Sequence, residues 1–96
     1  MTVVRLYIMP AADGMSATLG TALRALADAV RALPGCEGVE MLRDRSDERR
    51  FIFLEKWADV DAHKAGGAML DKSVFAPVMA ALAGPPDSAY FDYLIR

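Results

Sequence analysis

The stretch FIFLEKWADVDAHKAGGAM, residues 51–69, decides the fold, because an alternating apolar pattern gives way within it to helical spacing. It contains the only tryptophan and the only histidine of the chain, Trp57 and His63. The alternating part predicts a β-strand over residues 49–57. A helix with Asp59 as its N-cap is expected to follow.

Both faces of this strand are apolar at its centre. One face carries Phe51, Phe53 and Trp57, and the other carries Ile52 and Leu54. A strand with one wet face would instead alternate apolar and polar side chains. One layer of helices covers only one face of a sheet, so something else must cover the second.

Two further strands lie upstream. Residues 36–43, CEGVEMLR, are expected to pair with residues 49–57 as a hairpin around the polar connection DRSDE. Residues 2–9, TVVRLYIM, alternate in the same way and predict a first strand, which the following PAADG breaks.

A helix is predicted between the first strand and the hairpin. Apolar residues follow each other there at intervals of four and three, as on one stripe of an amphipathic helix: Leu19, Leu23, Leu26, Val30 and Leu33. Asp13 or Ser16 can cap the start of this helix, and Pro34-Gly35 ends it.

Downstream, the Gly66-Gly67 pair is expected to break or loosen the second helix. Helical spacing resumes in DKSVFAPVMAAL, where Pro77 sits early in the helix or kinks it. The final stretch SAYFDYLIR, residues 88–96, predicts a last strand. Its two faces carry Phe91, Tyr93 and Ile95 against Tyr90, Asp92 and Leu94.

The predicted order is β-α-β-β-α-β. Right-handed crossovers turn this order into an α+β, ferredoxin-like fold, in which a four-stranded antiparallel sheet carries its helices on one face. The other face of the sheet is apolar in this sequence. Two such sheets packed face to face would bury it, so a homodimer is expected.

Composition limits the classes of function. A chain of 96 residues predicts a single domain, residues 1–96. The net charge of −2 does not favour nucleic acid or an anionic membrane as a partner. The start of the sequence lacks the pattern of a signal peptide, which favours a cytoplasmic protein. Cys36 is the only cysteine, so it forms no internal disulfide, and with a single histidine no zinc site is expected.

The segments FIFLEKW and ADVDAHKAGGAM, with LPGCEGVEMLRD before them, resemble the antibiotic biosynthesis monooxygenase (ABM) domain over essentially the whole chain. The resemblance implies a dimeric α+β barrel of two ferredoxin-like subunits. It also implies oxygenation of quinol-like or polyketide-type aromatic substrates by dioxygen, without metal, flavin or other cofactor.

Two features of that family are placed differently in this sequence. Many members carry the histidine about one turn further along the helix, at the position of Gly66, whereas His63 lies three residues earlier. The haem-degrading branch uses an asparagine in the first strand and a histidine late in the second helix. VVRLYIM contains no asparagine and VFAPVMAAL no histidine, so haem ligation of that kind is not expected.

Cofactor-free oxygenation needs a dry pocket, a base and a wall that orients the substrate. His63 is the predicted base, because its unperturbed pKa of about 6.5 suits proton removal near neutrality. Trp57 is predicted to act with His63 in catalysis, by forming a flat apolar wall against the substrate. The expected substrate-binding residues are Tyr7, Phe53, Phe75 and Tyr93, and Tyr90 is a further candidate for a hydrogen bond to the substrate.

Competing interpretations remain at this point. Trp57 could be an ordinary core residue, and His63 a surface residue paired with Asp59. The protein could be a cofactor-independent monooxygenase, a non-catalytic ligand-binding or stress-associated dimer of the same fold, or a ferredoxin-like regulatory or interaction module. A pocket reached by both Trp57 and His63 would favour the first two over the third.

Overall fold

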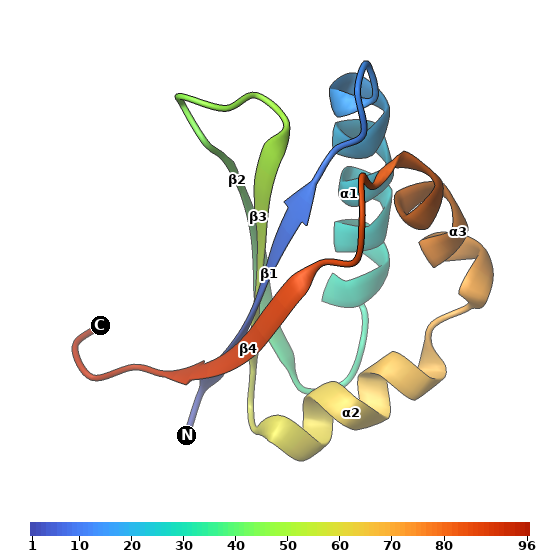
Figure 1. Cartoon of the computed structure of the whole chain (residues 1–96). Helices are drawn as coiled ribbons and strands as arrows, with labels where there is room; N and C mark the ends of the chain where they lie inside the picture. Colours follow the sequence, from blue (N-terminus) through green and yellow to red (C-terminus); the bar gives the residue numbers. More distant parts are fainter.

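The computed structural model describes residues 1–96 and confirms the predicted α+β, ferredoxin-like fold (Figure 1). Its elements are β1 (Val3–Pro10), α1 (Ser16–Arg31), β2 (Cys36–Arg43), β3 (Arg50–Trp57), α2 (Val60–Met69), α3 (Lys72–Ala81) and β4 (Asp87–Asp92). The expected second helix is therefore two helices, α2 and α3. All three helices lie on one side of the sheet (Figure 1).

The sheet has the strand order β2-β3-β1-β4, and every neighbouring pair is antiparallel. The register places Tyr7 of β1 opposite Phe53 of β3 and Ser88 of β4. Because side chains alternate along a strand, residues that share a register position share a face. The register therefore decides which side chains face the helices.

The predicted core stripes are confirmed. Phe51, Phe53 and Trp57 of β3 are buried on the face that the helices cover. The α1 residues that pack against them are Leu19, Leu23, Leu26 and Val30, all buried. α1 also packs along α3, so the core lies between the sheet and these two helices.

The helical segment does break before α3, but the prediction that the break falls at Gly66-Gly67 is wrong. α2 continues through both glycines to Met69, and the chain leaves helical geometry at Leu70 instead. Two glycines weaken a helix by only about 1 kcal/mol each. Here the absence of a side chain at Gly66 lets α2 approach the buried indole of Trp57.

Of the two predicted helix N-caps, the one of α2 is confirmed and the one of α1 is not. Asp59 caps α2 by accepting a hydrogen bond from Ala62 N at 2.7 Å. The predicted cap of α1 is wrong, because Met15 occupies the N-cap position and no side chain caps that helix. The Asp13 carboxylate instead pairs with Arg49.

The last strand is shorter than predicted. β4 ends at Asp92, whose partner in β1 is Val3, the first residue of that strand. Beyond this point β1 offers no backbone groups for pairing, so the tail leaves the sheet and ends away from the helices (Figure 1).

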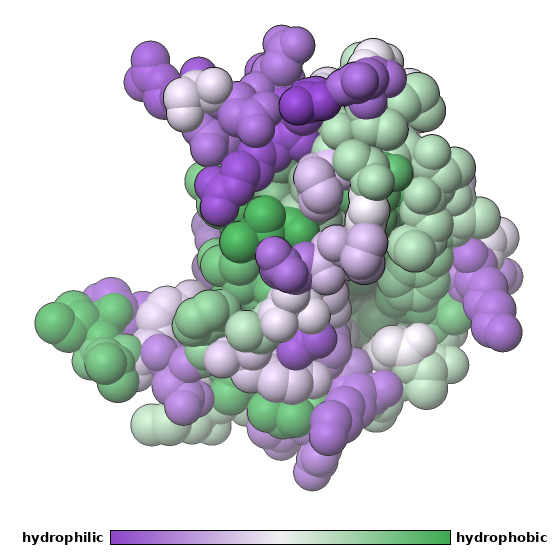
Figure 2. Space-filling view, viewed as in Figure 1, coloured by the Kyte–Doolittle hydropathy of each residue, from purple (hydrophilic) through white to green (hydrophobic).

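The second face of the sheet carries no helix. We call it the open face, and its apolar residues are Val4, Leu6, Ile8, Leu42, Ile52, Leu54, Ala89 and Phe91. Leu42 is 53% exposed and Phe91 51%. The tail adds Leu94 and Ile95, which are almost fully exposed. This C-terminal tail is the projection at the left of Figure 2, and its end is hydrophobic.

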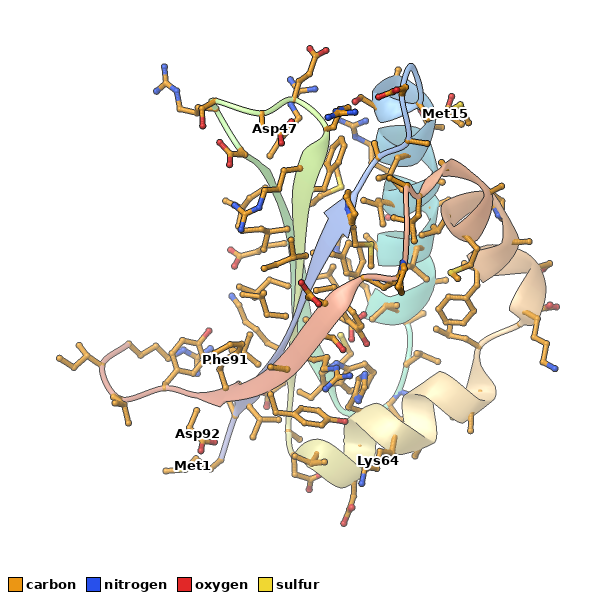
Figure 3. The ribbon with its side chains drawn as sticks, viewed as in Figure 1. Met1, Met15, Asp47, Lys64, Phe91 and Asp92 are labelled. Atoms are coloured by element: carbon orange, nitrogen blue, oxygen red, sulfur yellow. The ribbon has the colours of Figure 1, made fainter.

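Charged side chains gather at the turn between β2 and β3. Asp47 marks this turn, which lies at the opposite end of the sheet from α2 and its exposed Lys64 (Figure 3). This agrees with the polar connection expected from the sequence. None of the helices is both long and apolar enough to cross a membrane.

Candidate functional site

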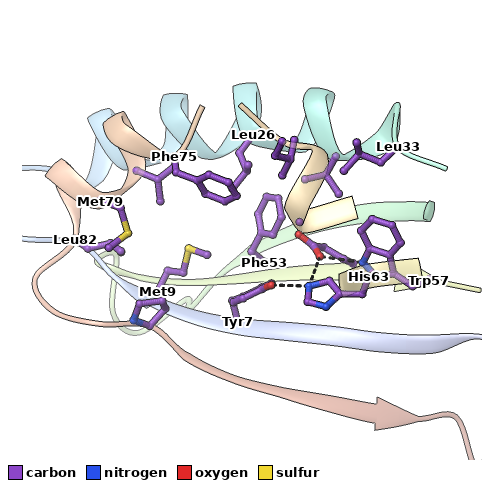
Figure 4. Close-up of a pocket in the computed structure, with 16 residues that line it drawn as sticks. Tyr7, Met9, Leu26, Leu33, Phe53, Trp57, His63, Phe75, Met79 and Leu82 are labelled. Carbon is purple, nitrogen blue, oxygen red and sulfur yellow. Dashed lines mark hydrogen bonds and ion pairs between the residues drawn. The ribbon is translucent and has the colours of Figure 1, made fainter. Parts of the chain in front are cut away.

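A cavity of about 220 Å³ lies between the helix-bearing face of the sheet and the helices (Figure 4). Twelve of its sixteen lining residues are hydrophobic. α1 contributes Leu26 and Val30, and α3 contributes Phe75 and Val78. An enclosure of this kind, mostly apolar with a few polar groups, is typical of small-molecule sites.

The structure brings five of the six predicted site residues together. Tyr7, Phe53, Trp57, His63 and Phe75 all line the cavity. Phe53 is fully buried at its base, and the Tyr7 ring meets the Phe53 ring edge-on, with 6.4 Å between centroids.

Tyr93, the sixth predicted residue, does not line the cavity. It lies beyond the end of β4, where the Arg96 guanidinium sits 4.5 Å from its ring centroid. Tyr90 of β4 lies on the helix-bearing face, because it pairs with Arg5 of β1, two residues from Tyr7. The alternation of side chains along the last strand already put Tyr90 and Tyr93 on opposite faces.

His63 is held between two tyrosine hydroxyls. Tyr7 Oη lies 3.0 Å from Nε2 of His63, and Tyr90 Oη lies 2.6 Å from Nδ1. β1, β4 and α2 thus meet at one imidazole. The alternative of a surface His63 paired with Asp59 is wrong, because Asp59 is occupied in capping α2 and the His63 side chain is only 16% exposed.

Glu55 is the only charged residue that is buried. Its Oε1 accepts a hydrogen bond of 2.9 Å from Nε1 of Trp57 and lies 3.6 Å from Nε2 of His63. Glu55 also lines the cavity. We call Tyr7, Glu55, Trp57, His63 and Tyr90 the polar cluster; its bonds within the cavity are dashed in Figure 4.

Burial sets the protonation of this cluster. It lowers the pKa of His63 below 6.5, and the positive charges of Arg5 and Lys64 act in the same direction. Burial raises the pKa of Glu55, against the opposing effects of the Trp57 hydrogen bond and of Arg5. Burial also raises the pKa of Tyr7. At neutral pH the imidazole is therefore uncharged, as a proton acceptor must be.

Arg5 lies behind the cluster rather than in the cavity. Its guanidinium carbon lies 4.3 Å from the ring centroid of Tyr90 and 5.3 Å from that of Tyr7, and one of its nitrogens donates to Ser88 Oγ at 2.8 Å. The Arg5 guanidinium thus packs against the rings of both tyrosines whose hydroxyls hydrogen-bond to His63.

Glu55 and Arg5 were not predicted as site residues. The signal for Glu55 was present, because alternation along β3 puts it on the same face as Phe53 and Trp57. A carboxylate on a core face is rarely buried without a partner or a function. Arg5 likewise shares a face with Tyr7 in the first strand.

The packing around Gly66 leaves no room for a histidine at that position. A Cβ atom at position 66 would lie 2.7 Å from Cη2 of Trp57 and 3.3 Å from Cδ1 of Leu33. No side chain fits there while the indole keeps its place. One turn earlier, His63 meets the Trp57 ring edge-on with 5.5 Å between centroids.

We expect Gly66→Ala to destabilise the protein by about 1–3 kcal/mol, the usual cost of overpacking a core. Gly67→Ala is the matched control, because a Cβ atom there meets nothing within 4 Å. The control should be neutral or stabilising by up to about 1 kcal/mol, through helix propensity. Urea unfolding of both variants is the measurement, and equal stabilities would show that α2 does not rest on Trp57.

The cavity can bind a flat, largely apolar molecule. Its titratable groups, Glu55 and His63, can accept a proton at one point of the wall. No group of three or more His, Cys, Asp or Glu side chains is placed to hold a metal ion.

Comparison with known proteins agrees with this geometry. The sequence model of the antibiotic biosynthesis monooxygenase family matches residues 1–65. No protein with a curated description matches the chain. SnoaB, a cofactor-independent oxygenase from Streptomyces nogalater, has a similar structure, with a TM-score of 0.88, 17% identity, and coverage of 99% of this chain and 95% of SnoaB.

Two further solved structures are similar. A candidate antibiotic biosynthesis monooxygenase from Caulobacter crescentus has a TM-score of 0.82 and 24% identity, covering 98% of this chain and 91% of its own. A protein from Shewanella oneidensis has a TM-score of 0.80 and 25% identity, covering 94% and 88%. At these identities the likeness establishes the fold.

Proposed function

The chain belongs to the antibiotic biosynthesis monooxygenase family, and from this premise we propose that it is a cofactor-independent monooxygenase for quinol-like or polyketide-type aromatic substrates. The observation that carries the proposal is the apolar cavity with a neutral imidazole and a buried carboxylate on its wall. The similarity in fold to SnoaB, a cofactor-independent oxygenase, is consistent with it.

The proposed reaction begins with removal of a proton from a hydroxyl group or an activated methylene group of the bound aromatic. The resulting anion passes an electron to dioxygen, and the radical pair combines to form a carbon–oxygen bond. Loss of water then leaves a carbonyl group. The substrate supplies all four electrons that dioxygen takes up, one oxygen atom entering the product and the other leaving as water.

The residues have separate roles in this proposal. Phe53 and Trp57 form the apolar wall on the sheet side, and Phe75 of α3 faces them across the cavity. His63 is the centre of the polar cluster and fixes the hydroxyl of Tyr7, which is placed to hydrogen-bond a substrate oxygen. Exclusion of water by the apolar lining strengthens each of these interactions.

Oxygen uptake with small quinols and anthrones tests the proposal. The protein should accelerate uptake and form one quinone or ketone per dioxygen consumed, with no added metal or flavin. An anaerobic sample should bind the same compounds without change. Binding without turnover in air would contradict the enzyme proposal and favour a ligand-binding protein of the same fold.

We also propose that two copies of the chain, each a single domain of residues 1–96, associate through the open face. A continuous apolar surface on one face of a monomer is unusual unless a partner covers it. Leu54 lies near the centre of this face, opposite Leu6 of β1. A specific dimer should bury more than about 1,200 Å² in total.

Sedimentation of the wild type should therefore give a dimer at micromolar concentration. Leu54→Lys should shift it to a monomer, because a lysine in the centre of an apolar interface loses its hydration. Ala65→Lys, on the exposed side of α2, is the control and should remain dimeric. A wild type that sediments as a monomer would refute the proposed interface.

A further inference from the structure

Both ring nitrogens of His63 are already engaged. Tyr7 Oη lies 3.0 Å from Nε2, and Tyr90 Oη lies 2.6 Å from Nδ1. A substrate hydroxyl can reach neither nitrogen without displacing a tyrosine. The imidazole is thus poorly placed to take a proton directly from a molecule in the cavity.

Glu55 has a free oxygen atom beside the same cavity. Oε1 is held by the indole N–H of Trp57, whereas Oε2 has no hydrogen-bond partner in the protein. Oε2 is not sealed in the core either, because Arg5 Nε is the only fully enclosed side-chain polar atom without a partner. Since Glu55 lines the cavity, Oε2 is the oxygen of this carboxyl that can still accept a hydrogen bond from a bound molecule.

The neighbours of Glu55 fit a carboxylate that receives a proton. A carboxylate oxygen 3.6 Å from Nε2 of His63 favours the imidazole tautomer with its proton on Nε2. Nδ1 then accepts from Tyr90, and Tyr7 accepts from Nε2–H, which leaves the Tyr7 proton for an oxygen in the cavity. Burial raises the pKa of Glu55 and makes it a stronger base than an exposed carboxylate.

We propose that Glu55 is the catalytic base of this site and selects uncharged hydroxyaromatic molecules. The inference rests on the proposed function and names the atom that accepts the proton. The O–H bond of the substrate breaks, a bond forms between Oε2 and hydrogen, and the negative charge moves to the substrate oxygen. The Tyr7 hydroxyl then donates a hydrogen bond to that oxygen.

The same carboxylate makes the site selective by charge. No lysine or arginine lines the cavity, and the one cation behind the cluster, Arg5, already offsets the charge of Glu55, so no lining cation pairs with a second negative charge. A hydroxyl group can donate to Oε2, whereas a phenolate or a carboxylate on the ligand faces a like charge in a desolvated space. Neutral hydroxyaromatics should therefore bind in preference to their carboxylated analogues.

Three nitroaromatic probes of similar shape test this selectivity: 4-nitrophenol, nitrobenzene and 4-nitrobenzoate. Trp57 is the only tryptophan and lines the cavity, so quenching of its fluorescence reports binding. At pH 6.5 the wild type should bind 4-nitrophenol about 10-fold more tightly than nitrobenzene, as expected for a hydrogen bond to a charged acceptor. It should bind 4-nitrobenzoate at least about 10-fold more weakly than nitrobenzene.

The pH dependence of 4-nitrophenol binding is the sharper measurement, because this phenol ionises near neutrality. The titratable and charged groups around Glu55 are Arg5 and Tyr7 on β1, Cys36 on β2 and His63 on α2. The lining residues from α1 and α3 are uncharged. Burial keeps the pKa of His63 below 6.5 and raises that of Cys36 above 9.0, so neither changes charge in between. Wild-type affinity should fall as the probe loses its proton.

Glu55→Gln should reverse this dependence. The indole N–H of Trp57 holds the amide oxygen in place of Oε1, which turns the NH₂ group, a donor, toward the cavity. The variant should then bind the phenolate at least as tightly as the phenol and admit 4-nitrobenzoate. Its oxygenation rate should fall about 10²- to 10⁴-fold, the contribution of a general base.

The outcomes separate this inference from the proposed function. If Glu55→Gln keeps the wild-type preference for the phenol, or oxygenates quinols at the wild-type rate, Glu55 is not the base, although the enzyme proposal stands. If the preference reverses but no form consumes oxygen, recognition by Glu55 is supported and the oxygenase proposal fails. Should the variant not fold, the wild type still decides: equal affinity for nitrobenzene and 4-nitrobenzoate would overturn the inference.

Discussion

Replacement of His63 by alanine is expected to lower the rate of quinol or anthrone oxygenation about 10²-fold or more, as for the misplacement of groups that must meet the substrate in one geometry. The imidazole is the only link between the hydroxyls of Tyr7 and Tyr90. Its loss frees both hydroxyls, removes the group beside Oε1 of Glu55 and lets water into the space. The loss should appear mainly in kcat, because the apolar walls that bind the ring remain.

The pH profile identifies the cause of that loss. An imidazolium 3.6 Å from Glu55 would weaken the carboxylate as a base, so the wild-type rate should rise as His63 loses its proton. Because burial lowers the pKa of His63 below 6.5, the midpoint of the rise should lie below pH 6.5. Ala65→Ser, on the exposed side of the same helix and without a change of charge, is the control and should keep the wild-type rate. Equal rates and profiles for His63→Ala and wild type would remove His63 from the mechanism.

The strand pattern was predictable because alternation is a local property of the chain. Phe51, Phe53 and Trp57 have to share a face once residues 50–57 form a strand, and burial in the core decides which face turns inward. The spacing of leucines in α1 works in the same way. These patterns determine the fold without any knowledge of the tertiary contacts.

The continuity of α2 was not predictable from local propensity. Two adjacent glycines favour a break, but Gly66 is needed where the helix rests on the Trp57 indole. That contact joins residues from different elements and depends on how close the helix comes to the sheet. Tertiary packing therefore overrides a preference worth about 1 kcal/mol per glycine.

The candidate site was predictable in part. His63 and Trp57 stood out because each is the only residue of its type and they lie close together in the sequence. Glu55 was overlooked because acidic residues are usually exposed, although its position in β3 already placed it between Phe53 and Trp57 on the core face. Its bond to the indole and its free oxygen could be seen only with the side chains in place.

Replacement of Trp57 by alanine is expected to lower the free energy of unfolding by about 3–5 kcal/mol, as for other large aromatic side chains in a core. The indole is 1% exposed and lies against Gly66 of α2. Its removal leaves a void between α2 and the sheet and also strips Glu55 of its hydrogen bond. Urea unfolding should be followed by circular dichroism, because the variant has no tryptophan fluorescence.

Trp57→Phe separates the two causes. It keeps an aromatic ring in the core and loses the N–H donor to Glu55, so its loss of stability should be smaller, about 1.5–3 kcal/mol for a hydrogen bond to a charged group. Only the alanine variant should also lose most of its affinity for aromatic probes, because the wall of the cavity is gone. All proteins must be compared at one concentration, since association adds to apparent stability. A loss below about 1 kcal/mol in Trp57→Ala would mean that the indole neither packs the core nor supports α2 as described.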